Sequence, residues 1–139
     1  MKNPMKAFVL GNIILIMVLG LFGAYAVSLS SREHYETTPD TLAYWILSGP
    51  DVVNIEAMVG KDRFSGYEYG FHEDSVTEKL IFKAGTPDSA LDFAQQQMEK
   101  AGYKVERVED NGTVVLNKDK GYELYIDKTE PKGIRIESK

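Results

Sequence analysis

A long uncharged stretch near the amino terminus constrains this chain more than any other feature. No Asp, Glu, Lys or Arg occurs in residues 7–31. A bilayer core of ~30 Å requires about 20 predominantly apolar helical residues. Residues 7–27 number 21, and at ~1.5 Å per residue a helix of that length extends ~31 Å. We therefore predict a transmembrane helix over residues 7–30.

The charges on either side of this stretch predict its orientation. Lys2 and Lys6 precede it, whereas Arg32 is followed at once by Glu33. Because basic residues accumulate on the cytoplasmic side of membrane helices, we expect residues 1–6 to form a cytoplasmic N-terminus. The rest of the chain would then be the periplasmic or extracellular part of a single-pass protein of the inner (plasma) membrane.

A cleaved signal peptide is the alternative to a retained anchor. The residues Ala24-Tyr25-Ala26 have the A-x-A form of a cleavage site, and the basic residues before the stretch would be the n-region. The apolar core of a signal peptide usually spans ~7–15 residues, so the greater length here favours a signal-anchor that stays in the membrane. Both interpretations export the remainder of the chain.

Small residues recur along the expected membrane helix. Gly20, Ala24 and Ser28 are four residues apart and share one helix face, and such small-xxx-small patterns let a second helix approach closely. Asn12 adds a polar side chain at membrane depth, which favours a hydrogen-bonded partner. We therefore expect the helix to contact the bilayer and, through these four residues, another membrane protein or a second copy of itself. The alternative is that they only reflect the composition of membrane helices.

Composition limits what the rest of the chain can do. None of the 139 residues is Cys and the net charge is −5, so disulfides and Cys-based metal or redox sites are excluded. An acidic chain repels phosphate backbones, so we expect no nucleic-acid partner. All 21 acidic residues follow the apolar stretch. This predicts a polar tether over residues 31–41 and one extracytoplasmic domain over residues 42–139.

The pattern of the outer part predicts an α+β fold in which an antiparallel sheet packs on one main helix. A short apolar segment that ends at Gly49-Pro50 predicts a helix over residues 39–48. A Thr-Pro-Asp start followed by apolar residues at helical spacing predicts the main helix over residues 86–101. Apolar alternation predicts strands over residues 52–59, 67–71, 76–83, 103–109, 113–117, 122–127 and 134–136.

Three signals mark where the chain reverses in its second half. Gly102 lies where a left-handed residue ends a helix. Asn111-Gly112 predicts a type I′ hairpin turn. Residues 118–121 predict another turn before the next strand.

Two groups of aromatic residues are candidates for a partner or ligand surface. Tyr67, Tyr69 and Phe71 alternate along one strand and share one face. Tyr44 and Trp45, the one Trp of the chain, lie in the short helix. Aromatic side chains suit the membrane interface and binding surfaces. They equally form the buried face of an antiparallel sheet.

No pattern in the sequence indicates catalysis. The G-x-S-x-G, P-loop, G-x-G-x-x-G and H-E-x-x-H motifs are missing. His34 and His72 are isolated imidazoles in polar segments, without the convergent ligands that a metal site requires. We therefore expect no catalytic residue, no cofactor and no metal. A hydrolase that uses a carboxylate pair such as Glu56 and Glu68 is a weaker alternative.

Residues 76–137 resemble the small extracytoplasmic α+β domains of bacterial lipoproteins and single-pass envelope proteins. The likeness is carried by the Thr-Pro-Asp helix start, the segment MEKAGYKVERV, the Asn-Gly hairpin, and the segments YELYI and GIRIES. The resemblance implies an accessory, sensory or assembly role. The lipidation Cys of the lipoprotein members is absent here.

These observations favour a non-enzymatic single-pass membrane protein that serves as an accessory or assembly subunit of a bacterial cell-envelope membrane complex. The alternative is a tethered or exported ligand-binding or sensor domain that uses its aromatic sheet face. The two hypotheses differ in whether the aromatic residues are accessible.

The predicted orientation can be tested with protease. Protease added to intact spheroplasts should digest the domain that follows the membrane helix, because Lys2 and Lys6 hold the amino terminus in the cytoplasm. Protection that is complete until the spheroplasts are lysed would contradict this orientation.

Overall fold

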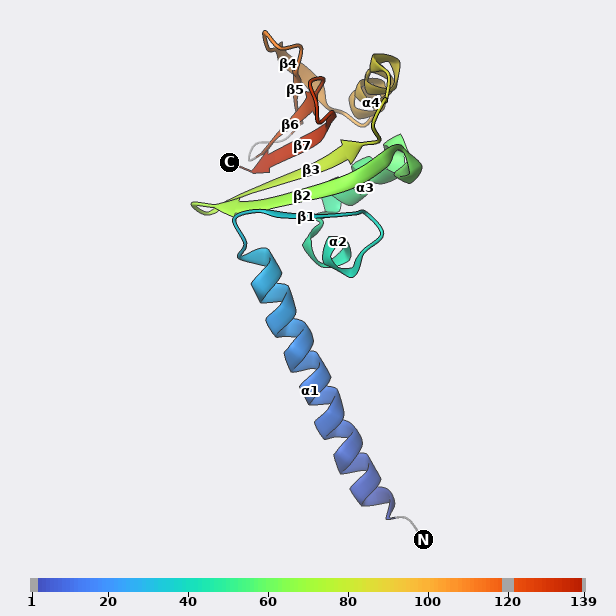
Figure 1. The fold of residues 1–139 in the computed structure, drawn as a ribbon, viewed down its shortest axis with the longest axis vertical. Helices are drawn as coiled ribbons and strands as arrows, with labels where there is room; N and C mark the ends of the chain where they lie inside the picture. The colour runs from blue at the N-terminus through green and yellow to red at the C-terminus, as the bar shows by residue number, and fades with distance from the viewer. Residues whose placement is uncertain (1–2, 119–121, 139) are drawn as a thin grey trace.

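A computed structural model describes residues 3–118 and 122–138. It has the predicted α+β class: a long apolar helix leads into a seven-stranded antiparallel sheet with shorter helices (Figure 1). Lys2 and all but the first residue of the turn expected at 118–121 lie outside the described residues. The elements are α1 (Pro4–Ser30), β1 (Tyr35–Thr37), α2 (Leu42–Leu47), α3 (Pro50–Val59), η1 (Lys61–Arg63), β2 (Phe64–His72), β3 (Ser75–Phe82), α4 (Asp88–Lys100), β4 (Lys104–Val108), β5 (Val114–Asn117), β6 (Tyr122–Asp127) and β7 (Gly133–Ser138).

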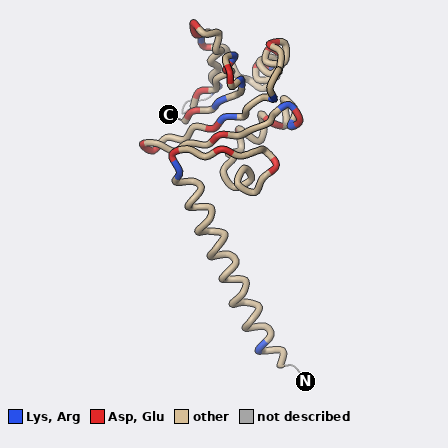
Figure 2. The backbone as a smooth tube through the Cα atoms, in the orientation of Figure 1, with Lys and Arg blue, Asp and Glu red and all other residues tan. Residues whose placement is uncertain are grey.

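Helix α1 projects away from the domain over most of its length (Figure 1). Asn3 caps it by accepting a hydrogen bond from the Met5 N–H at 3.0 Å. Figure 2 shows no charged residue between its first turn and its junction with the domain. Its 27 residues correspond to ~40 Å, which is enough to cross a bilayer core of ~30 Å. The same length and composition also fit a signal sequence.

The sheet has the strand order β1-β2-β3-β7-β6-β5-β4, and every neighbouring pair is antiparallel. The last strand of the chain, β7, lies between β3 and β6, so it joins the first hairpin to the later meander. Leu80, Ile134 and Ile126 form one cross-strand row and are almost fully buried. The strands predicted over residues 67–71 and 76–83, and the four after them, are present with bounds shifted by a few residues.

Helices α3 and α4 contact each other and cover one face of the sheet (Figure 1). Leu91, Ala94 and Met98 of α4 are buried at helical spacing, which confirms the main predicted helix. Its bounds differ slightly, because Pro87 occupies the N-cap position. Gly102 follows with φ 102°, as expected after a helix end.

The strand predicted over residues 52–59 is wrong, because this segment is helix α3. Pro50 occupies its first turn, where a missing N–H needs no partner. Gly49-Pro50 therefore starts a helix as well as ending α2. The suggested pairing of Glu56 with Glu68 across a hairpin is also wrong. The buried residues of α3 have helical spacing: Val52, Ile55, Glu56 and Val59.

The segment expected to be a free tether, residues 31–41, contains strand β1. Its three residues pair with β2 in antiparallel register. Thr41 then caps α2 by accepting a hydrogen bond from the Tyr44 N–H at 3.2 Å. The folded domain therefore begins before residue 42, and little free chain separates it from α1.

The hairpin between β4 and β5 is present, but its turn is not type I′. Gly112 has φ 88°, whereas Asn111 does not have a positive φ. The Gly112 N–H donates to the Glu109 carbonyl oxygen at 2.9 Å, and the Glu109 N–H donates to the Thr113 carbonyl oxygen at 2.8 Å. This is the pattern of a type I turn followed by a left-handed residue, which also joins strands in a hairpin.

Candidate functional site

The last turn of α1 is built into the core of the domain. Leu29 is 1% exposed and belongs to the buried cluster formed with the sheet and the other helices. The Tyr69 hydroxyl on β2 donates to the Ser30 carbonyl oxygen at 2.6 Å, and the Phe71 N–H donates to the Arg32 carbonyl oxygen at 3.1 Å. The last carbonyl groups of a helix have no hydrogen-bond donor within the helix. The domain supplies such a donor to the carbonyl of Ser30.

Helix α2 turns one side to the domain and the other side outward. Tyr44 is buried, and its ring packs edge-on against that of Tyr67 with 4.9 Å between centroids. Trp45 is 70% exposed, and its ring centroid lies 6.2 Å from that of Phe22 on α1. Adjacent helical residues point ~100° apart, which separates these two aromatic residues. α2 therefore bridges the domain core and α1.

The aromatic face of β2 belongs to the core. Tyr67 and Tyr69 are buried, and Phe71 is half-buried against the same cluster. Tyr44 packs on this face from α2. Of the five aromatic residues considered as a partner or ligand surface, Trp45 is the one whose side chain is open.

The small-residue face of α1 has no partner within the described chain. Gly20, Ala24 and Ser28 are exposed, and a Cβ built on Gly20 would meet no described atom within 4 Å. The Asn12 side-chain amide donates to the Phe8 carbonyl oxygen at 2.9 Å, so it is satisfied within its own helix. The packing of these residues against a second helix stays a prediction.

A carboxylate that the sequence analysis missed lies on the buried face of the sheet. Glu78 of β3 is paired with Tyr69 on one side and Ile136 on the other. The Tyr67 hydroxyl donates to Glu78 Oε1 at 2.6 Å, and the Gly49 N–H donates to the same oxygen at 2.9 Å. Burial raises the pKa of Glu78, and these two hydrogen bonds offset the rise only in part.

The alternation of β3 was the signal that could have located this carboxylate. Leu80 and Phe82 are buried, and residues two apart in a strand share a face, so Glu78 had to point the same way. Glu56 of α3 is buried. Burial, and then the neighbouring Glu56, raise the pKa of the Tyr44 hydroxyl. The half-buried Glu78 and the buried Glu56 thus bring two carboxyl groups to the place where α2, α3 and the sheet meet.

The opposite face of the sheet carries a network of ion pairs. Lys79 Nζ and Arg135 Nε lie 3.2 and 3.1 Å from the same oxygen, Oδ2 of Asp127. Burial alone would raise the pKa of Asp127, but these two cations outweigh burial and hold the pKa below its ordinary value. The Arg135 guanidinium also lies 4.1 Å from the centroid of the Tyr125 ring. Because these charges are paired with one another, they contribute to the structure of the sheet.

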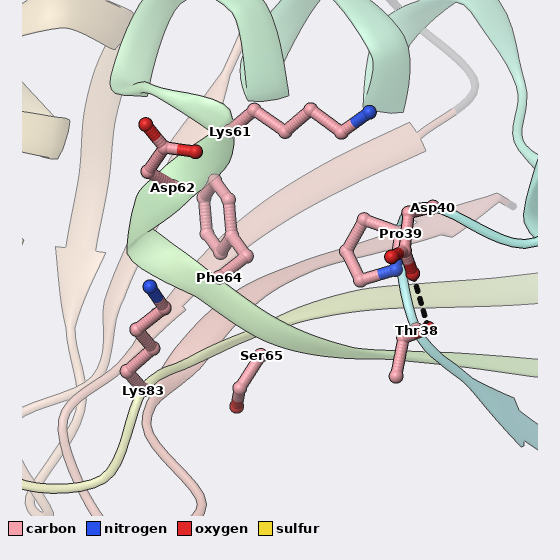
Figure 3. A pocket seen from close by; sticks show the side chains of 8 residues that line it. All are labelled: Thr38, Pro39, Asp40, Lys61, Asp62, Phe64, Ser65 and Lys83. Carbon is pink, nitrogen blue, oxygen red and sulfur yellow. Dashed lines mark hydrogen bonds between the residues drawn. The ribbon is translucent and has the colours of Figure 1, made fainter.

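A surface hollow of about 330 Å³ lies between the loop before α2 and the start of β2 (Figure 3). Thr38 donates to Asp40 at 2.5 Å at one edge, and this bond lowers the pKa of Asp40. Lys61, Asp62 and Lys83 line the other side (Figure 3). Exposed charges of both signs are untypical of a ligand pocket, which is mostly apolar. Among the described residues, no group of three His, Asp or Glu is placed to hold a metal ion.

A comparison with solved structures finds a similar fold, whereas the comparisons of sequence find no match. No protein-family model and no curated protein sequence matches it. The solved structure of crystal form IV of TP0453 is similar over 79% of this chain, with a TM-score of 0.48 and 12% identity. This chain spans 43% of the length of that protein.

The half-buried Glu78 generates a prediction about stability and pH. Glu78→Gln should raise the free energy of unfolding at pH 7 by on the order of 1 kcal/mol, because it removes a partly buried charge and keeps an acceptor for Tyr67 and Gly49. An acid whose pKa is raised by folding stabilises the protein below its unfolded-state pKa of about 4.3, and this stability is lost as pH rises through the folded-state pKa. The gain should therefore fade near pH ~4 in denaturant titrations of the full chain in mild detergent.

Glu68→Gln is the matched control, since Glu68 lies on β2 and faces away from Tyr67 and Tyr69. It should not produce a gain that depends on pH in this way. An equal gain from both variants, or a Glu78→Gln gain that persists in acid, would contradict the assignment of a partly buried charge at Glu78.

Proposed function

We propose that this chain is a non-enzymatic, single-pass membrane protein that acts as an accessory or assembly subunit of a bacterial cell-envelope membrane complex. Residues 1–6 face the cytoplasm, α1 spans the inner membrane, and the α+β domain lies on the periplasmic or extracellular side. One observation carries the proposal: an exposed apolar helix of spanning length has Leu29 of its last turn buried in the core of the domain.

The short connection between helix and domain supports a role beyond tethering. α1 ends at Ser30 and β1 begins at Tyr35, and the Ser30 carbonyl is held by Tyr69 within that span. A domain joined in this way keeps a set height and orientation relative to its membrane helix. A subunit that presents a surface to a neighbouring membrane protein needs this fixed geometry, whereas a tethered binding domain does not.

The position of the small-residue face also supports the proposal. Successive helical residues turn by ~100°, so Gly20 and Ala24 each lie ~200° from Phe22. Phe22 is the residue that contacts Trp45 of α2. The small residues therefore point away from the domain, and a second helix can approach them without meeting it.

The alternatives from the sequence have less support. A ligand-binding domain that uses the aromatic sheet face would need Tyr67 and Tyr69 open, and both are buried. Cleavage of a signal peptide after Ala26 would remove Phe22 from its contact with Trp45. The proposal therefore keeps α1 as a permanent anchor.

Replacement of small residues by Leu tests the proposed role of α1. The double change Gly20→Leu with Ala24→Leu keeps the helix apolar, so the amount of protein in the membrane should be unchanged. It blocks close approach, so co-purification of a partner, or self-association, should fall after extraction in mild detergent. The loss should be partial, because interhelical contacts in bilayers are often worth only ~0.6–2 kcal/mol.

The control is Gly11→Leu with Val18→Leu. It also adds bulk at two positions, but both lie on the side of α1 opposite Gly20 and Ala24, since successive helical residues turn by ~100°. A Cβ at Gly11 would meet no described atom within 4 Å, and Val18 is exposed. This control should keep the association of the wild-type protein. If both double variants keep the same partners, α1 is a plain anchor and the proposed packing is wrong.

A further inference from the structure

The outward side of α2 is apolar. Leu42 is 55% and Trp45 70% exposed, and helical residues three apart are neighbours on one face. No charged residue occurs in residues 41–50. A helix on the water-facing surface of a soluble domain turns a polar face outward. The outward face of α2 therefore suits an apolar environment rather than water.

The place of α2 along α1 identifies that environment. Trp45 contacts Phe22, which lies eight residues before the end of α1 at Ser30. A bilayer core of ~30 Å that begins at Lys6 ends about 20 residues later, near Ala26. Phe22 then lies ~6 Å inside the outer boundary of the core, at ~1.5 Å per residue. Trp45 faces Phe22, so its ring lies near the outer boundary of the hydrocarbon core.

The orientation of α2 fits this depth. Figure 1 shows α2 on the side of the sheet from which α1 leaves, beside the outer end of that helix. Ala43, Tyr44 and Leu47 on its other side are buried in the domain core. Trp rings favour the boundary between headgroups and acyl chains, where one part of the ring is apolar and the N–H stays wet.

We propose that α2 lies in the outer headgroup boundary of the bilayer, with Leu42 and Trp45 in contact with lipid. This inference rests on the proposed function, because it requires α1 to span the membrane. The attraction is to the apolar boundary rather than to anionic headgroups, since the charged residues that bracket α2, Asp40 and Asp51, are both acidic.

Attachment at two points has a consequence for α1. A spanning helix alone leaves the tilt of the domain relative to the bilayer unrestrained. Contact of α2 with the bilayer surface restrains this tilt, and the contact between Trp45 and Phe22 sets the side of α1 on which the domain sits. The face of Gly20 and Ala24 then points along the membrane, away from the domain, toward any neighbouring helix.

Fluorescence of the unmodified protein tests this placement, because Trp45 is the one Trp of the chain. The full chain is reconstituted at a low protein-to-lipid ratio into phosphatidylcholine vesicles that carry bromine near the headgroup end, at the middle or near the methyl end of the acyl chains. Trp45 emission should be blue-shifted and should lose most intensity with bromine near the headgroup end. Aqueous iodide should have little effect.

Two single-Trp variants supply the reference depths. Trp45→Phe with Leu15→Trp places the probe near the middle of α1, at an exposed position off the small-residue face, where bromine near the methyl end should quench it most. Trp45→Phe with Val108→Trp places the probe on β4 at an exposed position of the domain, where iodide should quench it and brominated lipid should not.

The outcomes separate this inference from the proposed function. If iodide quenches Trp45 as strongly as the Val108→Trp probe, α2 lies in water and the inference is wrong. If neither bromine nor iodide reaches Trp45, protein covers it and the inference is again wrong. In both cases a Leu15→Trp probe quenched by brominated lipid leaves the membrane anchor intact. If the Leu15→Trp probe is not quenched by lipid, the anchor itself fails and the proposed function falls with it.

Discussion

The burial of Leu29 at the end of α1 joins a long apolar helix to a folded domain, and the position of the domain relative to that helix depends on this contact. An apolar helix of this length would ordinarily leave its last carbonyls to water. Here the Tyr69 hydroxyl donates a hydrogen bond to the Ser30 carbonyl oxygen, and β1 begins a few residues later on the edge of the sheet. Because β1 is short and paired, the chain has little freedom between α1 and the domain. The position of α2 beside Phe22 then follows from the fold.

The two faces of the sheet handle charge in different ways. On the face opposite the helices, Asp127 is paired with Lys79 and Arg135, which hold its pKa low in spite of burial. On the helix-covered face, Glu78 has hydrogen bonds from Tyr67 and Gly49, and its pKa is raised by burial. A paired carboxylate stabilises the fold at neutral pH, whereas a carboxylate without a cation opposes it. Glu78 does, however, tie the start of α3 to the sheet through the Gly49 N–H.

Sequence patterns predicted the elements that have a single clear signal. The uncharged run of residues predicted α1, and the alternation of apolar residues predicted the strands around Tyr67 and Leu80. Residues 52–59 were misassigned because their apolar residues fit alternation and helical spacing alike, and packing against α4 decides between them. β1 was missed because its pairing uses backbone groups that a polar sequence also provides. The contact of Trp45 with Phe22 joins residues far apart in the chain, so no local pattern indicated it.

The central claim is that α1 and the domain move as one body, and a distance distribution between the two tests it most directly. The chain has no Cys, so Ile16→Cys with Val108→Cys gives two unique positions for spin labels, one on α1 and one on β4. In lipid nanodiscs, pulsed electron paramagnetic resonance should give a single narrow distribution of the distance between the two spin labels. A variant with a flexible Gly-Ser insertion after Ser30 should give a broad one. A distribution in the uninterrupted chain as broad as that of the insertion variant would contradict the account.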